Sequence, residues 1–375
     1  MSALFSNVSQ LNWQQVVMWC IGGLLIYLAI RKDMEPTLLL PLGFGAILVN
    51  LPMSGAVTQV YDGIAEIGVI DVLFDAGIAN ELFPLLLFVG IGAMIDFEPL
   101  LTNPKLMIFG AAAQFGIFFT LSLAALFGFD LKDAASIAII GAADGPTSIF
   151  VANYFHSKYI GAIMVAAYSY MALVPVVQPP VIKLFTTKQE RRIRMVYQQR
   201  SVSKITKILF PIAITVITGI VSPRSVALIG FLMFGNLIRE CGVLDSLSET
   251  AQKVLANLVT LFLGITIATK MQAQYFLTAE TLLILGLGLV AFVFDTAGGV
   301  IFAKILNLFL PKDSKINPMI GAAGISAFPM SARVVHKLGR AEDPQNFLLM
   351  PAVGVNVSGQ IASVIAGGLI LNLLG

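Results

Sequence analysis

Charged side chains are scarce in this chain, and that scarcity excludes an ordinary soluble domain. Asp, Glu, Lys and Arg make up 12% of the 375 residues, against about 25% in soluble domains. The net charge of +2 is too small to indicate a nucleic-acid partner. Hydrophobic residues reach 57% and the mean hydropathy is +0.89. Apolar runs of about 20 residues recur along the whole chain, so we predict an all-α polytopic membrane protein.

Cysteines are few, and nucleotide-binding motifs are lacking. Cys20 and Cys241 lie far apart, and they predict neither a disulfide framework nor a metal cluster. The sequence contains no Walker phosphate loop, and Gly90-Ile91-Gly92 is interpreted as a helix-packing position. No cleavable signal peptide is expected, because residues 1–15 carry no charge and Met18 begins a spanning run.

The two halves of the chain repeat short motifs in the same order. Four motifs recur 174 to 187 residues later: Gly68-Val-Ile-Asp71 as Gly242-Val-Leu-Asp245, Leu87-Phe-Val-Gly90 as Leu261-Phe-Leu-Gly264, Gly141-Ala-Ala143 as Gly321-Ala-Ala323, and Gly43-Phe44 as Gly230-Phe231. One match is weak, but four in one order indicate a duplication. We therefore predict a first membrane repeat over 1–187, a basic cytoplasmic linker over 188–207 and a second membrane repeat over 208–375.

The distribution of basic residues predicts the topology, because cytoplasmic loops are enriched in Lys and Arg. The predicted spans are 16–30, 36–50, 80–96, 104–128, 159–185, 205–221, 224–238, 254–270, 281–310 and 346–374. The segments 134–155 and 317–332 are predicted to be broken or re-entrant helices. Few basic residues then lie outside: Lys132, Lys158, Arg224 and Lys270. Each half has about five crossings plus one broken helix. Five is odd, so the halves form two inverted repeats, an architecture known from transporters.

The first broken segment carries an acid in apolar surroundings. Gly145 and Pro146 interrupt helical hydrogen bonding, and Asp144 is costly at membrane depth without a cation, a proton or a polar partner. Together with Thr147 and Ser148 it supplies hard oxygen ligands that suit a small alkali cation. The alternative interpretation is Gly/Ser helix packing, with Asp144 bonded to a neighbour.

The second broken segment is neutral. Asn317 and Ser326 offer oxygen ligands there, and Gly321 allows an interrupted backbone. One charged and one neutral segment would fit a monovalent cation. The alternative is a loop with a helix cap at Ser326.

Further polar residues lie in or near the predicted spans. Tyr168 and Tyr170 are interpreted as structural unless one of them donates a proton. Asn356 shares a helix face with Gln360, and interhelical bonding is the default interpretation for these and for Ser358 and Ser363. Three acids near predicted span ends are expected to be interfacial, although the third, beside two glycines, could line a vestibule: Asp96, Glu98 and Asp295. Arg333 either binds a carboxylate or anchors the cytoplasmic side.

Three of these motifs resemble a known family. The segments 141–148 (Gly-Ala-Ala-Asp-Gly-Pro-Thr-Ser), 167–180 and 317–326 are similar to the β subunit of the biotin-dependent sodium-pumping decarboxylases, which act on oxaloacetate, methylmalonyl-CoA or glutaconyl-CoA. The resemblance covers nearly the whole chain. It implies an enzyme and translocase that decarboxylates carboxybiotin on a carrier subunit, exports Na⁺ and consumes a proton.

The resemblance also implies partners and residue roles. The partners would be a biotin carrier subunit, a carboxyltransferase α subunit and a small membrane-anchored accessory subunit, in a homo-oligomeric assembly in the inner membrane of a bacterium. The implied catalytic residues are Asp144, Tyr170, with Tyr168 not excluded, and Arg333, which would also bind carboxybiotin. The resemblance implies the Na⁺ ligands Asp144, Asn317, Gly321, Ser326 and Asn356, and the hydroxyl groups of Thr147 and Ser148 complete the predicted set.

A different class of protein fits the composition and the repeats equally well. A Na⁺-coupled secondary transporter or Na⁺/H⁺ antiporter with inverted repeats is the alternative, and only the motif resemblance favours the decarboxylase. The substrate acid, the Na⁺ stoichiometry and the number of subunits do not follow from the sequence, because the acyl chemistry would belong to another subunit.

Overall fold

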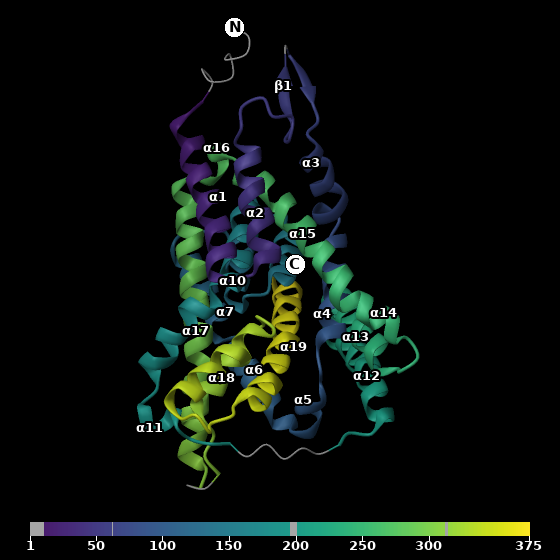
Figure 1. Cartoon of the computed structure of the whole chain (residues 1–375), viewed down its shortest axis with the longest axis vertical. Helices are drawn as coiled ribbons and strands as arrows, with labels where there is room; N and C mark the ends of the chain where they lie inside the picture. The colour runs from purple at the N-terminus through teal and green to yellow at the C-terminus, as the bar shows by residue number, and fades with distance from the viewer. Residues whose placement is uncertain (1–10, 62, 196–200, 312–313) are drawn as a thin grey trace.

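The protein is a helical bundle with a small β-hairpin at one end (Figure 1). The computed structural model describes residues 11–61, 63–195, 201–311 and 314–375. Within these ranges, seven helices are long and apolar enough to cross a membrane. One further pair, Val69–Ala79 with Leu82–Met94, is bent by 61° and forms either a broken span or a re-entrant loop. The prediction of a polytopic helical membrane protein is therefore confirmed.

The first half of the chain runs from the first helix to the longest helix before the linker. Its elements are α1 (Trp13–Lys32), α2 (Pro36–Val49), β1 (Gln59–Tyr61), β2 (Ile64–Glu66), α3 (Val69–Phe74), η3 (Asp75–Ala79), α4 (Leu82–Met94), α5 (Glu98–Thr102), η4 (Pro104–Leu106), α6 (Met107–Ala113), α7 (Phe115–Leu126), α8 (Leu131–Ala138), η5 (Ile139–Ala142), α9 (Gly145–Tyr154) and α10 (Ile160–Phe185).

The second half follows a short helix in the linker. Its elements, beginning with that helix, are α11 (Lys188–Arg191), α12 (Lys204–Val221), η6 (Pro223–Ser225), α13 (Val226–Glu240), α14 (Asp245–Thr250), η7 (Ala251–Leu255), α15 (Ala256–Ile267), η8 (Ala268–Met271), α16 (Ala273–Phe276), α17 (Ala279–Phe309), η10 (Pro318–Gly324), α18 (Met330–Glu342) and α19 (Leu349–Leu374).

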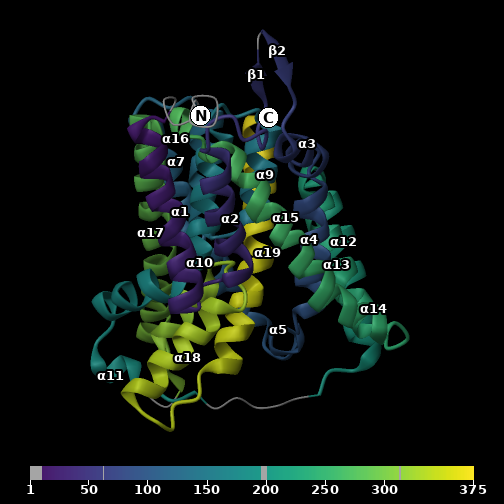
Figure 2. The same ribbon diagram turned by 45° about the horizontal axis from the view of Figure 1, so that its top comes forward.

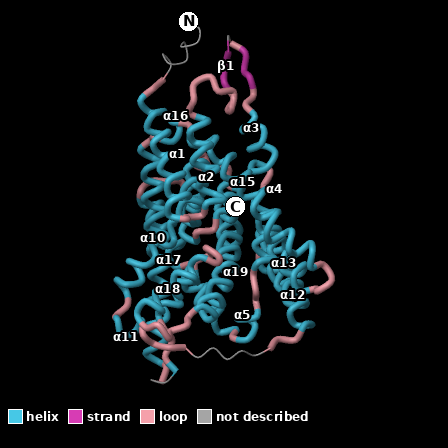
Figure 3. Tube along the Cα trace, in the orientation of Figure 1, coloured by secondary structure: helices cyan, strands magenta, loops and turns pink. Residues whose placement is uncertain are grey.

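The helices fall into two groups beside α19. Figure 2 shows α12, α13, α14 and α4 on one side, with α1, α2, α10 and α17 on the other. The hairpin projects from the end opposite α11, and Figure 3 shows its strands in magenta among helices in cyan. Helix α11 and the hairpin therefore mark opposite ends of the molecule.

Small residues bring α4 and α13 into backbone contact. A methyl group added to Gly92 would lie 1.8 Å from the carbonyl oxygen of Leu232, and one added to Gly235 would lie 2.0 Å from that of Val89. Such approach is typical of helix pairs in membranes, where packing rather than water exclusion drives association. On α12, by contrast, Ile220 is 76% exposed, as expected for a helix that faces lipid.

Most of the ten predicted spans correspond to helices, but two of them, 36–50 and 224–238, fall on α2 and α13, which have 14 and 15 residues and are shorter than the helices long enough to span. The predicted spans 159–185 and 281–310 correspond to α10 and α17, for example. The sequence did not predict the hairpin or the bend before α4, where the π-helical turn η3 precedes a left-handed residue, Glu81.

Candidate functional site

The first broken segment is interrupted just before Asp144. Ala143 has a left-handed backbone, with φ of 51°, which ends η5. Asp144 then caps α9, because its Oδ1 accepts a hydrogen bond from the backbone amide of Thr147 at 3.3 Å. Pro146 lies in the first turn of α9, where the missing amide hydrogen has no helical partner to lose. The predicted break is thus present, and the acid is at its helix-capping position.

The carboxyl group of Asp144 receives hydrogen bonds from both halves of the chain. Its Oδ2 accepts from Thr147 Oγ1 at 2.7 Å, from Ser363 Oγ at 2.9 Å and from Gln360 Nε2 at 3.1 Å. Thr147 lies on α9, and the other two donors lie on α19. The side chain is nearly inaccessible, with 3% exposed. The acid therefore lies where the two halves meet.

These hydrogen bonds offset the free-energy cost of burying the carboxylate. A charged side chain at membrane depth costs about 2.5–3.5 kcal/mol on insertion scales. A hydrogen bond to a charged group contributes about 1.5–3 kcal/mol, so four donors offset that cost. The hydroxyl groups and the Gln360 amide also carry oxygens, which become cation ligands if the side chains turn. The same side chains can thus hold either the bare carboxylate or a carboxylate with a cation.

The second broken segment contacts the first directly. The backbone amide of Ser326 donates to the carbonyl of Ala142 at 2.9 Å, two residues before Asp144. Ser326 Oγ donates to the carbonyl of Gly359 on α19 at 3.1 Å. Asn356 Nδ2 donates to the carbonyls of Ala323 and Ile325, at 3.1 and 2.7 Å. The structure therefore brings Ser326 and Asn356 to the junction with the Asp144 segment.

The other predicted ligands lie apart from the carboxyl group. Ser148 Oγ donates to the backbone carbonyl of Asp144 at 2.8 Å, inside the first turn of α9. Gly321 packs against α17, where a methyl group would lie 2.0 Å from the carbonyl oxygen of Gly299. Asn317 caps η10 and donates to the backbone carbonyls of Arg191 and Ile193, at 3.0 and 2.8 Å.

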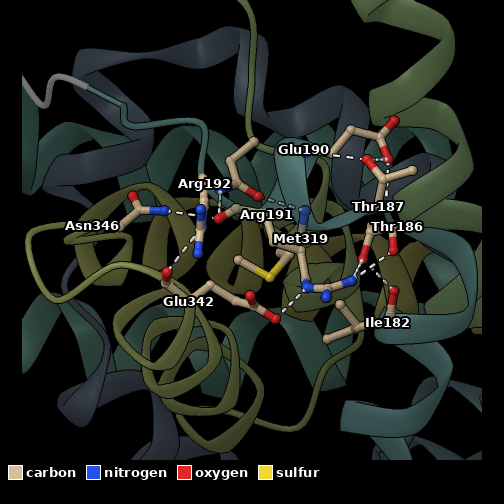
Figure 4. A network of polar contacts seen from close by, with 10 residues as sticks. Ile182, Thr186, Thr187, Glu190, Arg191, Arg192, Met319, Glu342 and Asn346 are labelled. Carbon is tan, nitrogen blue, oxygen red and sulfur yellow. Dashed lines mark hydrogen bonds and ion pairs between the residues drawn. The ribbon is translucent and has the colours of Figure 1, made fainter.

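The linker residues beside Asn317 form a polar network (Figure 4). Arg191 is 7% exposed and forms an ion pair with Glu342 at 2.7 Å. Its carbonyl also accepts from Asn346 Nδ2 at 2.9 Å. Asn317 therefore ties the second broken segment to the linker rather than to Asp144.

The two tyrosines occupy different surroundings. Tyr168 is buried, and a methyl group on Gly145 would lie 2.4 Å from its ring carbon Cζ. Its hydroxyl has no hydrogen-bond partner in the described part of the chain. The Tyr170 hydroxyl instead donates to the carbonyl of Leu285 on α17. Tyr168, not Tyr170, thus packs against the Asp144 motif.

Arg333 lies on α18 and is exposed. It is within electrostatic range of Glu35 in the loop between α1 and α2. Burial raises the pKa of the Glu35 carboxyl group, and the positive charge of Arg333 opposes that rise. Arg333 is thus accessible to an anion and is separate from the Asp144 cluster.

Two buried glutamines cross between the halves. Gln360 of the second half bonds Asp144 in the first broken segment, as described above. Gln178 of the first half bonds the second broken segment, donating to the carbonyl of Ala322 and to Ser331 Oγ, both at 2.7 Å. The sequence analysis assigned Gln360 and Ser363 only to general interhelical bonding and did not single out Gln178. Their polarity within apolar runs was the available signal.

The expectation for Asp295 was wrong. It lies in the middle of α17, fully buried, and not at an interface. The neighbouring glycines suggested a vestibule, but the backbone of Gly321 occupies the space at Gly299.

Among the described residues, no group of three or more His, Cys, Asp or Glu side chains could hold a metal ion.

Comparison with known proteins identifies the family. The family model of the Na⁺-transporting oxaloacetate decarboxylase beta subunit matches residues 14–374. The chain belongs to this family. It is 49% identical to the glutaconyl-CoA decarboxylase subunit beta of Acidaminococcus fermentans, over 97% of this chain and 94% of that protein. It is also 49% identical to the methylmalonyl-CoA decarboxylase subunit beta of Veillonella parvula, over 96% and 92%.

Oxaloacetate decarboxylase relatives are slightly more distant. The beta chain of Klebsiella pneumoniae is 44% identical, over 95% of this chain and 94% of that one. The curated relatives are subunits of decarboxylases, and this favours the decarboxylase over the plain secondary transporter. The chain is thus a β subunit of a Na⁺-transporting decarboxylase, as the sequence motifs predicted.

Proposed function

We propose that this chain decarboxylates carboxybiotin presented by a partner subunit and uses that reaction to export Na⁺. The observation that carries the proposal is the Asp144 carboxyl group, which accepts hydrogen bonds from α9 and α19 beside the contact of the two broken segments. A carboxylate bonded to both halves changes its surroundings whenever the halves move. A cation bound there would therefore be exposed to one side or the other.

The cation site would centre on Asp144 and Thr147. The oxygens of Ser363 and Gln360 extend the predicted ligand set, and Ser326 and Asn356 join it from the second segment. Asn356 Oδ1 is buried without a partner among the described residues, so it is available as a ligand. Asn317 and Gly321 would act by fixing the second segment against the linker and α17, and Ser148 by closing the first turn of α9.

The reaction needs an anion site and a proton. Cleavage of the C–N bond of carboxybiotin releases CO₂, and the biotin nitrogen takes up one proton. Arg333 would bind the carboxylate, since a guanidinium pairs with two oxygens at once. Tyr168 is the better placed of the two tyrosines to pass a proton near Asp144, and Tyr170 is retained as the alternative donor.

The proposed role of Arg333 has its own test. Arg333→Lys keeps the charge but loses the planar pair of donors. We expect it to raise the apparent KM for carboxybiotin more than that for Na⁺. An equal effect on both values would place Arg333 outside the carboxylate site.

We further propose that the two halves are inverted repeats. Gln178 of the first half bonds the second broken segment, and Gln360 of the second half bonds the first. This reciprocal pattern supports the arrangement. So do the π-helical turns η3 and η7, which begin at Asp75 and Ala251, near the spacing of the repeated motifs. Lys158 and Lys270, both predicted outside, line one cavity of about 470 Å³. The predicted repeats 1–187 and 208–375 are retained on these grounds.

Membership of the family supports a multi-subunit assembly. The partners would be a biotin carrier subunit, a carboxyltransferase α subunit and a small membrane-anchored accessory subunit, in a homo-oligomeric complex of a bacterial inner membrane. Co-purification with a biotinylated protein on avidin tests this. A chain that transports Na⁺ alone, with no decarboxylation, would instead be a secondary transporter.

The central experiment replaces Asp144 by Asn in the assembled complex, reconstituted into vesicles. Asn keeps the shape but removes the charge, so we expect Na⁺-stimulated decarboxylation and Na⁺ uptake both to fall by about 100-fold or more. Asp96→Asn is the matched control, because Asp96 lies at a helix end, 4.0 Å from Arg239. Full transport by the Asp144 variant would refute the proposal.

A further inference from the structure

A second acid lies buried in the bundle, at the centre of α17. Asp295 is fully buried in this 31-residue helix. Its Oδ1 accepts a hydrogen bond from the backbone amide of Ile117 on α7, at 3.1 Å. Its Oδ2 is buried and has no hydrogen-bond partner in the described parts of the chain. Asp144 has four donors, so the two acids differ in how far their charge is compensated.

The unpaired oxygen of Asp295 faces the segment that carries Asp144. A methyl group added to Gly141 would lie 2.5 Å from Oδ2, and one added to Gly116 would lie 2.7 Å from Oδ1. Both positions are therefore open to the carboxyl group only because they lack a side chain. Asp295 thus packs on the backbone three residues before Asp144.

Two hydroxyl groups on the same two helices are also without partners. Thr296 follows Asp295 on α17, and Thr120 lies one helical turn after Gly116 on α7. Both hydroxyls are buried without a partner among the described residues. A buried carboxylate oxygen without a donor, such as Oδ2 of Asp295, requires a cation or a proton to satisfy it.

The helix that carries Asp295 contacts both broken segments. Gly141 of the first segment packs at Asp295, and Gly321 of the second packs at Gly299, one turn further along α17. Asp295 and Gly299 thus lie one helical turn apart on the helix that both broken segments contact.

We propose that Asp295 is a second cation-binding carboxyl group of this pump, distinct from Asp144, and that it takes up a proton or Na⁺ during transport. A buried carboxyl group with one unpaired oxygen must be neutralised, and both ions do so. The tight contact with Gly141 suits a proton in this conformation, whereas Na⁺ requires the first segment to move away. The inference rests on the proposed function of Asp144, but it is tested separately.

A purely structural role makes a different prediction. If Asp295 serves only to accept the Ile117 hydrogen bond, Asn does the same through its amide oxygen. Asp295→Asn therefore separates the two roles, and Asp96→Asn controls for loss of an acid elsewhere in the chain.

The test uses the whole complex reconstituted in vesicles, with radioactive sodium and a pH-sensitive dye. We expect Asp295→Asn to lower Na⁺ uptake by about tenfold or more, with Asp96→Asn unchanged. Less bound sodium in the variant assigns Na⁺ to Asp295. Unchanged bound sodium with loss of proton uptake assigns a proton. Unchanged transport, bound sodium and proton uptake overturn the inference.

The proposals for the two carboxyl groups are contradicted by different results. An inactive Asp144→Asn variant beside a normal Asp295→Asn variant removes only this inference, and the reverse result removes only the function proposed for Asp144. If Asp295→Asn does not assemble, the wild-type complex is treated with a hydrophobic carbodiimide, and the modified peptides are identified by mass spectrometry. Protection of Asp295 by Na⁺, or by rising pH, supports the inference. Absent or unresponsive labelling overturns it.

Discussion

At the residue scale, hydrogen-bond donors from two helices explain how the buried Asp144 carboxyl group is tolerated. Three of its four donors are side chains, and two of those come from the other half of the chain. The sequence predicted the acid, its helix break and Thr147, because Gly145, Pro146 and the hydroxyl are neighbours in the chain. It did not assign Gln360 or Ser363 to the acid, because their approach depends on how α19 packs against α9.

Removal of one donor should weaken the site without abolishing it. Gln360→Leu keeps the approximate volume and removes one hydrogen bond to Asp144, which contributes about 1.5–3 kcal/mol when the partner is charged. We expect the Na⁺ concentration for half-maximal decarboxylation to change by about tenfold or more. Gln252→Leu is the control, since Gln252 of η7 donates to Ser248 Oγ of α14 at 3.0 Å and not to Asp144. Equal Na⁺ dependence in both variants would exclude Gln360 from the site.

The two tyrosines should separate in a single-turnover measurement of CO₂ release. If Tyr168 passes the proton, Tyr168→Phe slows the reaction by about 10²-fold or more, the usual range for general acid catalysis. Tyr170→Phe removes the bond to Leu285 and should cost about 1 kcal/mol of stability, with little loss of rate. The opposite pattern would assign the proton to Tyr170.

At the scale of the elements, close backbone contact fixes the broken segments. The motif matches and the glycines predicted that both segments would be interrupted. The backbone amide of Ser326 donates to the carbonyl of Ala142, so the two segments are paired directly. Asp295 was expected at an interface near a span end, or alternatively beside a vestibule at the neighbouring glycines, and both expectations were wrong, because it is buried in the middle of α17. In the structure the backbone of η10 fills that space at Gly299. A glycine pattern alone does not distinguish a vestibule from a close contact.

The contact of α17 with η10 predicts a difference between two glycines of one helix. Gly299→Ala would insert a methyl group 2.0 Å from the carbonyl oxygen of Gly321, whereas nothing lies within 4 Å at Gly286. We expect Gly299→Ala to destabilise the protein by about 1–3 kcal/mol and to lower Na⁺ transport. Gly286→Ala should be neutral or stabilising by up to about 1 kcal/mol. Thermal unfolding in detergent checks both, and equal melting temperatures would contradict the contact.

At the scale of the whole molecule, hydrophobic runs were sufficient to predict most spans, since lipid requires about 20 apolar residues per helix. The bend before α4 and the hairpin were not predictable, because they depend on local backbone geometry at residues such as Glu81. The sequence predicted a basic cytoplasmic linker but not that Arg191 within it is buried against Glu342. A basic residue in a polar run carries no signal for such docking.

Release of the linker should be visible by limited proteolysis. Arg191→Met removes the ion pair with Glu342 and the bond to the Thr186 carbonyl. Loss of about 1–2 kcal/mol of local stability would increase opening by about tenfold. We expect faster tryptic cleavage after Arg192 and Arg194. Lys188→Met is the matched control because it removes a neighbouring positive charge that is exposed. Equal cleavage rates in the two variants would show that Arg191 does not hold the linker.

The crossed glutamines have a consequence for how such a chain is assembled. Neither half contains all the partners of its own broken segment, because Gln360 completes the first and Gln178 completes the second. If the halves were produced as separate polypeptides, each would bury a glutamine amide without its hydrogen-bond partner. They would have to be co-expressed and would regain activity only by finding each other in the bilayer.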